Sequence, residues 1–128
     1  MRITVLFLGL VLSGCATVES WLPSFWDDNQ SARITDVRQR IESVDCRGDQ
    51  AAQARAILGD LQWFELYSQS KGQSQRSVIK LVEPIKATAQ DWLTRTKEGH
   101  ASEQYCVIKQ RILAQQAARA AESIMGRW

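Results

Sequence analysis

The chain has 128 residues, 45% of them hydrophobic, and a formal net charge of +2. That apolar fraction is typical of a folded soluble domain, and it excludes both a disordered chain and a protein that crosses a membrane several times. The length provides one hydrophobic core and leaves little room for a second.

The N-terminal segment predicts a leader sequence. Met1 and Arg2 give a short positive start, and a mostly apolar run follows from residue 3 to residue 12. This run has about half of the roughly 20 residues that a membrane-spanning helix needs, so it favours a cleaved signal peptide over a transmembrane anchor. We therefore expect residues 1–14 to be absent from the mature protein.

The leader ends in the tetrapeptide Leu12-Ser13-Gly14-Cys15. A branched apolar residue and two small residues before a cysteine resemble the lipobox of bacterial lipoproteins. The resemblance implies cleavage before Cys15, attachment of a diacylglycerol to its thiol, and acylation of the new amine with a fatty acid such as palmitate. The alternative is an ordinary secretory leader with an unmodified cysteine at its end.

The residue after Cys15 is Ala16, whereas in the lipoprotein family an aspartate there commonly retains the protein in the inner membrane. The resemblance therefore implies an outer-membrane lipoprotein that faces the periplasm. Two or more acyl chains bind a bilayer stably where one chain binds only marginally, so a triacylated Cys15 would tether the domain permanently.

Aromatic residues are concentrated just after the predicted anchor, where Trp21, Phe25 and Trp26 lie within six positions. Indole rings favour the headgroup level of a bilayer, because one edge is apolar and the N–H needs a polar partner. Residues 15–28 are therefore predicted to be a lipidated tether that lies on the membrane. The alternative is that the same side chains fold back and cap the core.

Glycines divide the remaining chain, residues 29–128, at regular intervals, and each follows a stretch with helical periodicity: Gly48, Gly72, Gly99 and Gly126. Glycine is common just after the C-terminus of a helix, and these stretches show little of the alternation expected for a strand. We predict an all-α domain, a four-helix bundle with up-and-down topology.

The first predicted helix runs from about residue 29 to residue 46, and one of Asp27, Asp28 or Asn29 caps it. The second follows Asp49 as its N-cap and ends near residue 70. Because its apolar surface is broad, we expect it to be the most buried helix. The apolar residues are Ile34, Val37, Ile41 and Val44 in the first helix, and Ala54, Ile57, Leu58, Leu61, Trp63, Phe64, Leu66 and Tyr67 in the second.

The third helix begins near residue 74 and contains Pro84, which predicts a kink or a break into two shorter helices. The fourth follows Ser102 and runs to residue 125, with an alanine-rich second half that lets a neighbour approach closely. The apolar residues are Val78, Leu81, Val82, Ile85, Ala89, Trp92 and Leu93 in the third helix, and Tyr105, Ile108, Ile112, Leu113, Ala117, Ala120, Ala121 and Ile124 in the fourth.

Two cysteines remain after Cys15, namely Cys46 and Cys106, an even number in an exported protein. Up-and-down topology places the end of the first helix beside the start of the fourth, so a disulfide between them is predicted. The alternatives are two buried thiols, or a zinc site in which His100 and a carboxylate complete the ligands. We expect neither a metal nor a cofactor.

Charge is distributed unevenly along the chain. Residues 15–64 carry 5 basic and 8 acidic side chains, whereas residues 65–128 carry 10 basic and 6 acidic ones. This asymmetry could orient the domain on anionic lipid or steer an acidic partner; the plainer interpretation is that the charges solvate the outer faces of the helices. The modest net charge argues against nucleic acid as a partner.

Motifs for catalysis are absent from the sequence: there is no paired-histidine helix motif, no nucleophile elbow and no phosphate-binding glycine loop. His100 is close to Glu98, Ser102 and Glu103, but Ser102 is already explained as a helix cap. We therefore predict that the protein is not an enzyme.

Trp63, Phe64 and Tyr67 form the most specific-looking segment, and Trp92 joins them as an aromatic residue of the third helix. These side chains are predicted either to pack in the core or to line a groove that captures a helix of a partner. Size, anchor and cysteine count resemble, in outline, the pilotins of type II secretion, small helical outer-membrane lipoproteins with a groove for the terminal segment of a secretin.

The outline resemblance to pilotins implies a binding or assembly role for a lipid-anchored envelope protein. One alternative is a cell-wall-remodelling enzyme or accessory factor, for which Glu98, His100 and Glu103 are the natural site residues. Another is a purely structural lipoprotein.

Overall fold

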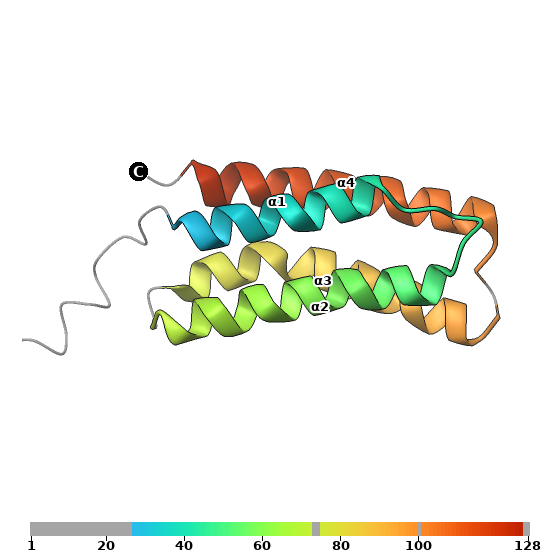
Figure 1. Cartoon of the computed structure of the whole chain (residues 1–128), viewed down its shortest axis with the longest axis horizontal. Helices are drawn as coiled ribbons and strands as arrows, with labels where there is room; N and C mark the ends of the chain where they lie inside the picture. The colour runs from blue at the N-terminus through green and yellow to red at the C-terminus, as the bar shows by residue number, and fades with distance from the viewer. Residues whose placement is uncertain (1–26, 73–74, 100, 127–128) are drawn as a thin grey trace, which may run out of the picture.

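Four α-helices make up the computed structural model, which describes residues 27–72, 75–99 and 101–126. They are α1 (Asp28–Glu42), α2 (Gln50–Ser70), α3 (Arg76–Lys97) and α4 (Glu103–Met125), and no strand occurs in these ranges. Each helix runs opposite to the one before it, and α4 returns to pack against α1 (Figure 1). The predicted all-α fold with four helices is confirmed.

Three of these helices begin with a side-chain cap. Asp27, Asp49 and Ser102 each accept a hydrogen bond from the backbone N–H three residues further along the chain. Each cap satisfies a donor that the first helical turn leaves unpaired, and is worth about 1 kcal/mol. All three were predicted capping positions. The N-cap of α3 is Gln75, whose side chain makes no such bond.

The first helix is shorter than predicted, because α1 ends at Glu42 rather than near residue 46. The backbone of the following loop finds other partners: the N–H of Asp45 donates to Oε1 of Gln53 at 2.7 Å, and Nε2 of Gln53 donates to the carbonyl of Asp45 at 2.8 Å. These bonds from α2 replace those that a further turn of helix would have made.

A disulfide closes the same end of the bundle. Cys46 in the loop after α1 is bonded to Cys106 in the first turn of α4, with their Cα atoms 5.6 Å apart. The predicted disulfide is confirmed, so the alternatives of two free thiols and of a zinc site that uses both thiolates are wrong.

Pro84 lies inside α3, which continues through it as one helix. The predicted break into two helices is therefore wrong, and the kink stays a prediction. Pro84 is exposed, whereas its neighbours Val82 and Ile85 are fully buried. The proline ring thus costs the helix a backbone hydrogen bond without disturbing the core behind it.

The core runs along the axis of the bundle and receives side chains from all four helices. Its largest fully buried apolar members are Trp92, Phe64, Ile34, Ile41, Ile57, Leu61, Ile85, Leu113 and Ile124.

The expectation that the second helix is the most buried is wrong: five of the 21 residues of α2 are buried, against five of the 15 residues of α1. Part of the apolar surface of α2 faces outward, where it exposes Trp63 and Leu66.

Candidate functional site

Several predicted site residues lie outside the residues that the structure describes. They are Cys15, Trp21, Phe25, Trp26 and His100. Lipid attachment at Cys15 and membrane contact by the three aromatic residues therefore stay predictions.

The predicted aromatic cluster divides between core and surface. Phe64 and Trp92 are fully buried, and the indole N–H of Trp92 donates to Oε1 of Gln50 at 3.1 Å. Trp63, in contrast, is 40% exposed, and Tyr67 is half-buried. Because two of the four side chains are enclosed in the core, the cluster does not line a common groove.

The two surface aromatics of α2 are held against α1. The rings of Trp63 and Tyr67 are stacked, with centroids 5.0 Å apart and planes 7° apart. The guanidinium of Arg33 lies 4.3 Å from the centroid of Trp63, in a cation–π contact. Asp60 accepts from Arg33 at 3.4 Å and from Arg40 at 2.6 Å. These contacts fix the orientation of Trp63 while much of its ring faces solvent.

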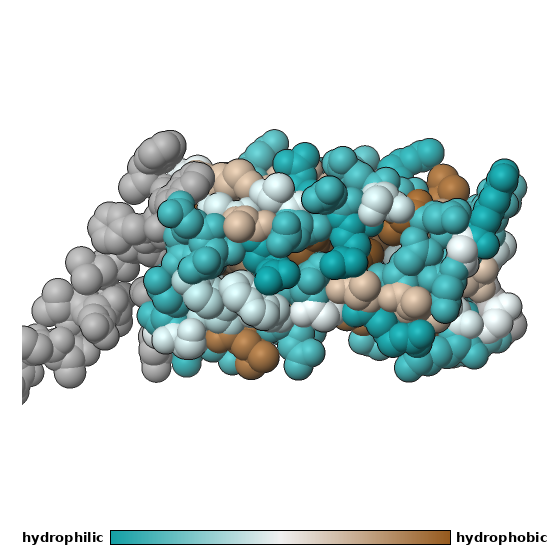
Figure 2. Space-filling model, in the orientation of Figure 1, coloured by the Kyte–Doolittle hydropathy of each residue, from teal (hydrophilic) through white to brown (hydrophobic). Residues whose placement is uncertain are grey.

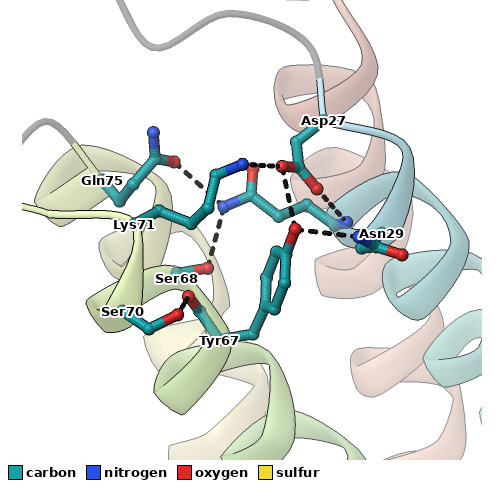
Figure 3. A network of polar contacts seen from close by, with 8 residues as sticks. Asp27, Asn29, Tyr67, Ser68, Ser70, Lys71 and Gln75 are labelled. Atoms are coloured by element: carbon teal, nitrogen blue, oxygen red, sulfur yellow. Dashed lines mark hydrogen bonds and ion pairs between the residues drawn. The ribbon is translucent and has the colours of Figure 1, made fainter.

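A polar network lies at the end of the bundle where α1 begins (Figure 3). Its inner layer is built on Gln30, which is fully buried. The two hydrogens of its Nε2 go to Oγ of Ser68 and Oε1 of Gln75, both at 2.9 Å. Because the buried amide is satisfied only when both partners are in place, these bonds stabilise one particular arrangement of α1, the end of α2 and the start of α3.

The outer layer of the network surrounds Asp27. Its carboxylate accepts from the Tyr67 hydroxyl at 3.2 Å and pairs with the Lys71 ammonium at 2.8 Å. Burial raises the pKa of the Asp27 carboxyl, but the hydrogen bonds from Lys71 and from the backbone of Gln30 outweigh burial, so the pKa lies below its ordinary value. The charged carboxylate fixes the point at which the chain enters the bundle.

A second surface feature is apolar and lies on α4. Val107 is 42% exposed, Ile108 54% and Ile112 37%; we call these three residues the α4 patch. Ile108 and Ile112 were expected to face the core, and this expectation is wrong because Cys106 and Leu113 take the inward side of the helix. Figure 2 shows a hydrophobic area near the start of α4, at the upper right. A hollow beside the patch is lined by Glu103, Gln104, Val107 and Ile108.

Titratable side chains meet between α3 and α4, but as an ion pair. Asp91 accepts from the Tyr105 hydroxyl at 2.8 Å and from the Lys109 ammonium at 2.6 Å. The hydrogen bonds from Lys109 and Tyr105 lower the pKa of Asp91, and burial together with the bond to Asp91 raises the pKa of Tyr105. Both shifts move these groups away from neutral pH, where a proton-transfer catalyst works best.

Of the residues suggested for an enzyme, the structure describes Glu98, Ser102 and Glu103 but not His100. Glu98 and Glu103 are exposed, and Oγ of Ser102 accepts the backbone N–H of Tyr105 at 3.1 Å, as its capping role requires. Within the described residues, no group of three or more His, Cys, Asp or Glu side chains could hold a metal ion.

No protein-family model matches the chain, and neither does a curated protein or a solved structure. In the described ranges, none of the helices has the length and apolar composition needed to cross a bilayer. A proposal for the function therefore rests on the sequence motifs and on the surfaces of the bundle.

Proposed function

We propose that this protein is a lipid-anchored helical bundle of the bacterial outer membrane that faces the periplasm and binds another component of the envelope without catalysing a reaction. The observation that carries the binding role is the α4 patch. Single exposed apolar residues are normal on a soluble domain, whereas adjacent ones mark interaction surfaces. Ile108 and Ile112 are neighbours because residues four positions apart share one side of a helix, and Val107 borders them about 100° around the helix from Ile108.

The surroundings of the α4 patch suit an interface. Exposed polar residues lie next to it on the same helix, among them Gln104, Arg111 and Gln115. A small apolar centre with a polar rim is the common anatomy of a binding surface. The hollow beside Ile108 would receive an apolar side chain of the partner.

The lipid anchor is supported by the tetrapeptide that ends at Cys15. Asp27, where the chain enters the bundle, lies twelve positions after Cys15. A chain of this length reaches at most about 40 Å, so the anchor would hold the bundle within that distance of the membrane. Mass analysis of the mature protein tests this directly: we expect a triacylated Cys15 as the first residue, and an unmodified Cys15 would overturn the anchor.

A photocrosslinking side chain placed at position 108 in the cell tests the binding role. We expect one discrete crosslinked envelope species at this position, and none at position 80, since Lys80 is exposed on α3 away from the patch. Val107→Gln should lower the yield at position 108 about tenfold, the effect of losing roughly 1.4 kcal/mol of binding. Equal yields at positions 108 and 80, or crosslinks to lipid alone, would overturn the binding role.

A further inference from the structure

The outward side of α2 carries an apolar surface that the bundle leaves open. Leu66 is 58% exposed and Trp63 is 40% exposed, and Gly59 and Gln62 are exposed with them. These four residues, which we call the α2 face, are three, four and seven positions apart and so share one side of the helix. Figure 2 shows a hydrophobic area at the lower left, over the C-terminal half of α2.

Gly59 is the unusual member of the α2 face. A glycine inside a helix costs roughly 0.5–1 kcal/mol relative to alanine. A Cβ atom added at Gly59 would meet no described atom within 4 Å, so packing within the bundle does not require a glycine there. Its exposed backbone leaves a shallow site into which a large side chain from another molecule can fit closely.

Charged residues on both long sides of the α2 face are paired, whereas Arg55, four positions before Gly59, is exposed at its N-terminal end. On one side, Asp60 binds Arg33 and Arg40. On the other side, the Lys86 ammonium lies 2.7 Å from the carboxylate of Glu65. The four residues of the face are themselves uncharged, so the centre of the contact between two copies would bring no like charges together.

We propose that two copies of this chain associate through their α2 faces, with the two α2 helices antiparallel about a two-fold axis between residues 62 and 63. In an antiparallel pair, residues whose numbers have a constant sum face each other. A sum of 125 places Leu66 of each copy over Gly59 of the other. The two-fold axis then brings the two Gln62 side chains together on one side of the contact and the two Trp63 side chains together on the other side. The seven-residue spacing of Gly59 and Leu66 is one coiled-coil repeat, which keeps both on the same stripe.

A second copy is favoured over an unrelated helix because the α2 face contains both a projecting side chain and a site that can receive it. Leu66 is the projecting side chain, Gly59 is the site that receives it, and the two-fold axis satisfies both contacts twice. An interface made by one helix from each copy is smaller than a standard stable interface, so the dimer is weak in dilute solution. Confinement to a membrane surface would raise the effective concentration and favour pairing.

The antiparallel arrangement also predicts an orientation. It places the starts of the two α1 helices at opposite ends of the dimer. They lie roughly 22 Å apart along the helix direction, because the C-terminal end of α2 is about 7.5 residues from the two-fold axis. If both copies are anchored through Cys15, the two-fold axis is perpendicular to the membrane. The helices of both bundles then lie parallel to the membrane surface. This orientation and the confinement that favours pairing rest on the proposed anchor, whereas the contacts of the α2 face do not.

Disulfide crosslinking of the full chain in intact cells tests the pairing whether or not the chain is anchored. Residue 62 would lie beside residue 62 of the other copy, so Gln62→Cys should give a disulfide-linked dimer on oxidation. The control is Lys80→Cys, at an exposed position of α3 outside both the α2 face and the α4 patch. A monomer with Gln62→Cys, or equal dimer yields from both variants, would overturn the proposal.

The contact between Gly59 and Leu66 can be tested by exchange. In the Gln62→Cys background, Gly59→Leu should lower the dimer yield about tenfold or more, while the melting temperature does not fall because leucine is the better helix former. Adding Leu66→Gly exchanges the two sites and should restore the dimer. An undiminished dimer with Gly59→Leu, or a folded exchange variant that stays monomeric, would show that this register is wrong.

Discussion

Removal of the disulfide should lower the stability of the domain by about 4 kcal/mol. The bridge joins residues 60 positions apart. In the chain-entropy model, closing a loop of about 60 residues lowers the entropy of the unfolded chain by about 14 cal/mol/K, which is about 4 kcal/mol at 25 °C. The total stability of such a domain is about 5–15 kcal/mol, so the bridge supplies a large share of it.

Urea unfolding followed by far-ultraviolet circular dichroism measures this loss. The cleanest comparison is between the oxidised protein and the same protein held reduced, because substitution of Cys106 would also remove a buried sulfur atom. We expect the unfolding midpoint to fall by about 2 M urea. A difference below about 1 kcal/mol would refute the reasoning, since it would mean that the unfolded chain already keeps the two cysteines close together.

Three further substitutions test other parts of the bundle. Gln30→Ala should destabilise the protein by roughly 2–4 kcal/mol in urea unfolding, because two acceptors lose the buried amide and a cavity remains; a loss below about 1 kcal/mol contradicts this. Pro84→Ala should raise the free energy of unfolding by roughly 1–3 kcal/mol, since alanine restores a backbone hydrogen bond on the exposed side of α3; an unchanged midpoint argues that the helix is already adapted to proline. Asp27→Asn keeps the cap but removes the charge, so it should cost about 0.5–1 kcal/mol at pH 7. Because the pKa of Asp27 is lowered in the folded protein, its charge stabilises the fold above the unfolded pKa, and this cost should disappear as the pH falls through the folded value. A cost that is equal at pH 7 and pH 2 would exclude a role for the charge.

The number of helices, three of their starting points and the disulfide could be predicted because their signals are local or follow from topology. A capping side chain acts three residues away, so Asp27, Asp49 and Ser102 identify helix starts without knowledge of the rest of the fold. The end of α1 could not be predicted in this way. It depends on Gln53, a side chain of the next helix that takes over the backbone of the loop.

The α4 patch was missed although the sequence contains a signal for it. Cys106, Leu113 and Ala120 are seven residues apart and form the buried stripe of α4. At about 100° per residue, Ile108 lies about 200° around the helix from Cys106, on the opposite side. The sequence therefore shows apolar residues on two opposite sides of this helix. Only one of these sides can face the core, so the other could have been predicted to be exposed. The buried network of Gln30 has no such signal, because its partners are 38 and 45 residues away.

The disulfide also determines which helices carry a mechanical load. Force applied between residues 27 and 126 passes along α1 to Cys46, across the sulfur bridge to Cys106, and along α4. Both points of attachment lie at the end of the bundle opposite the bridge (Figure 1), so α1 and α4 would separate from each other turn by turn, as a zipper opens. α2 and α3 belong to the covalently closed loop and bear none of that tension. Under such a pull the domain would lengthen by one limited step, with its rupture stopped at the bridge.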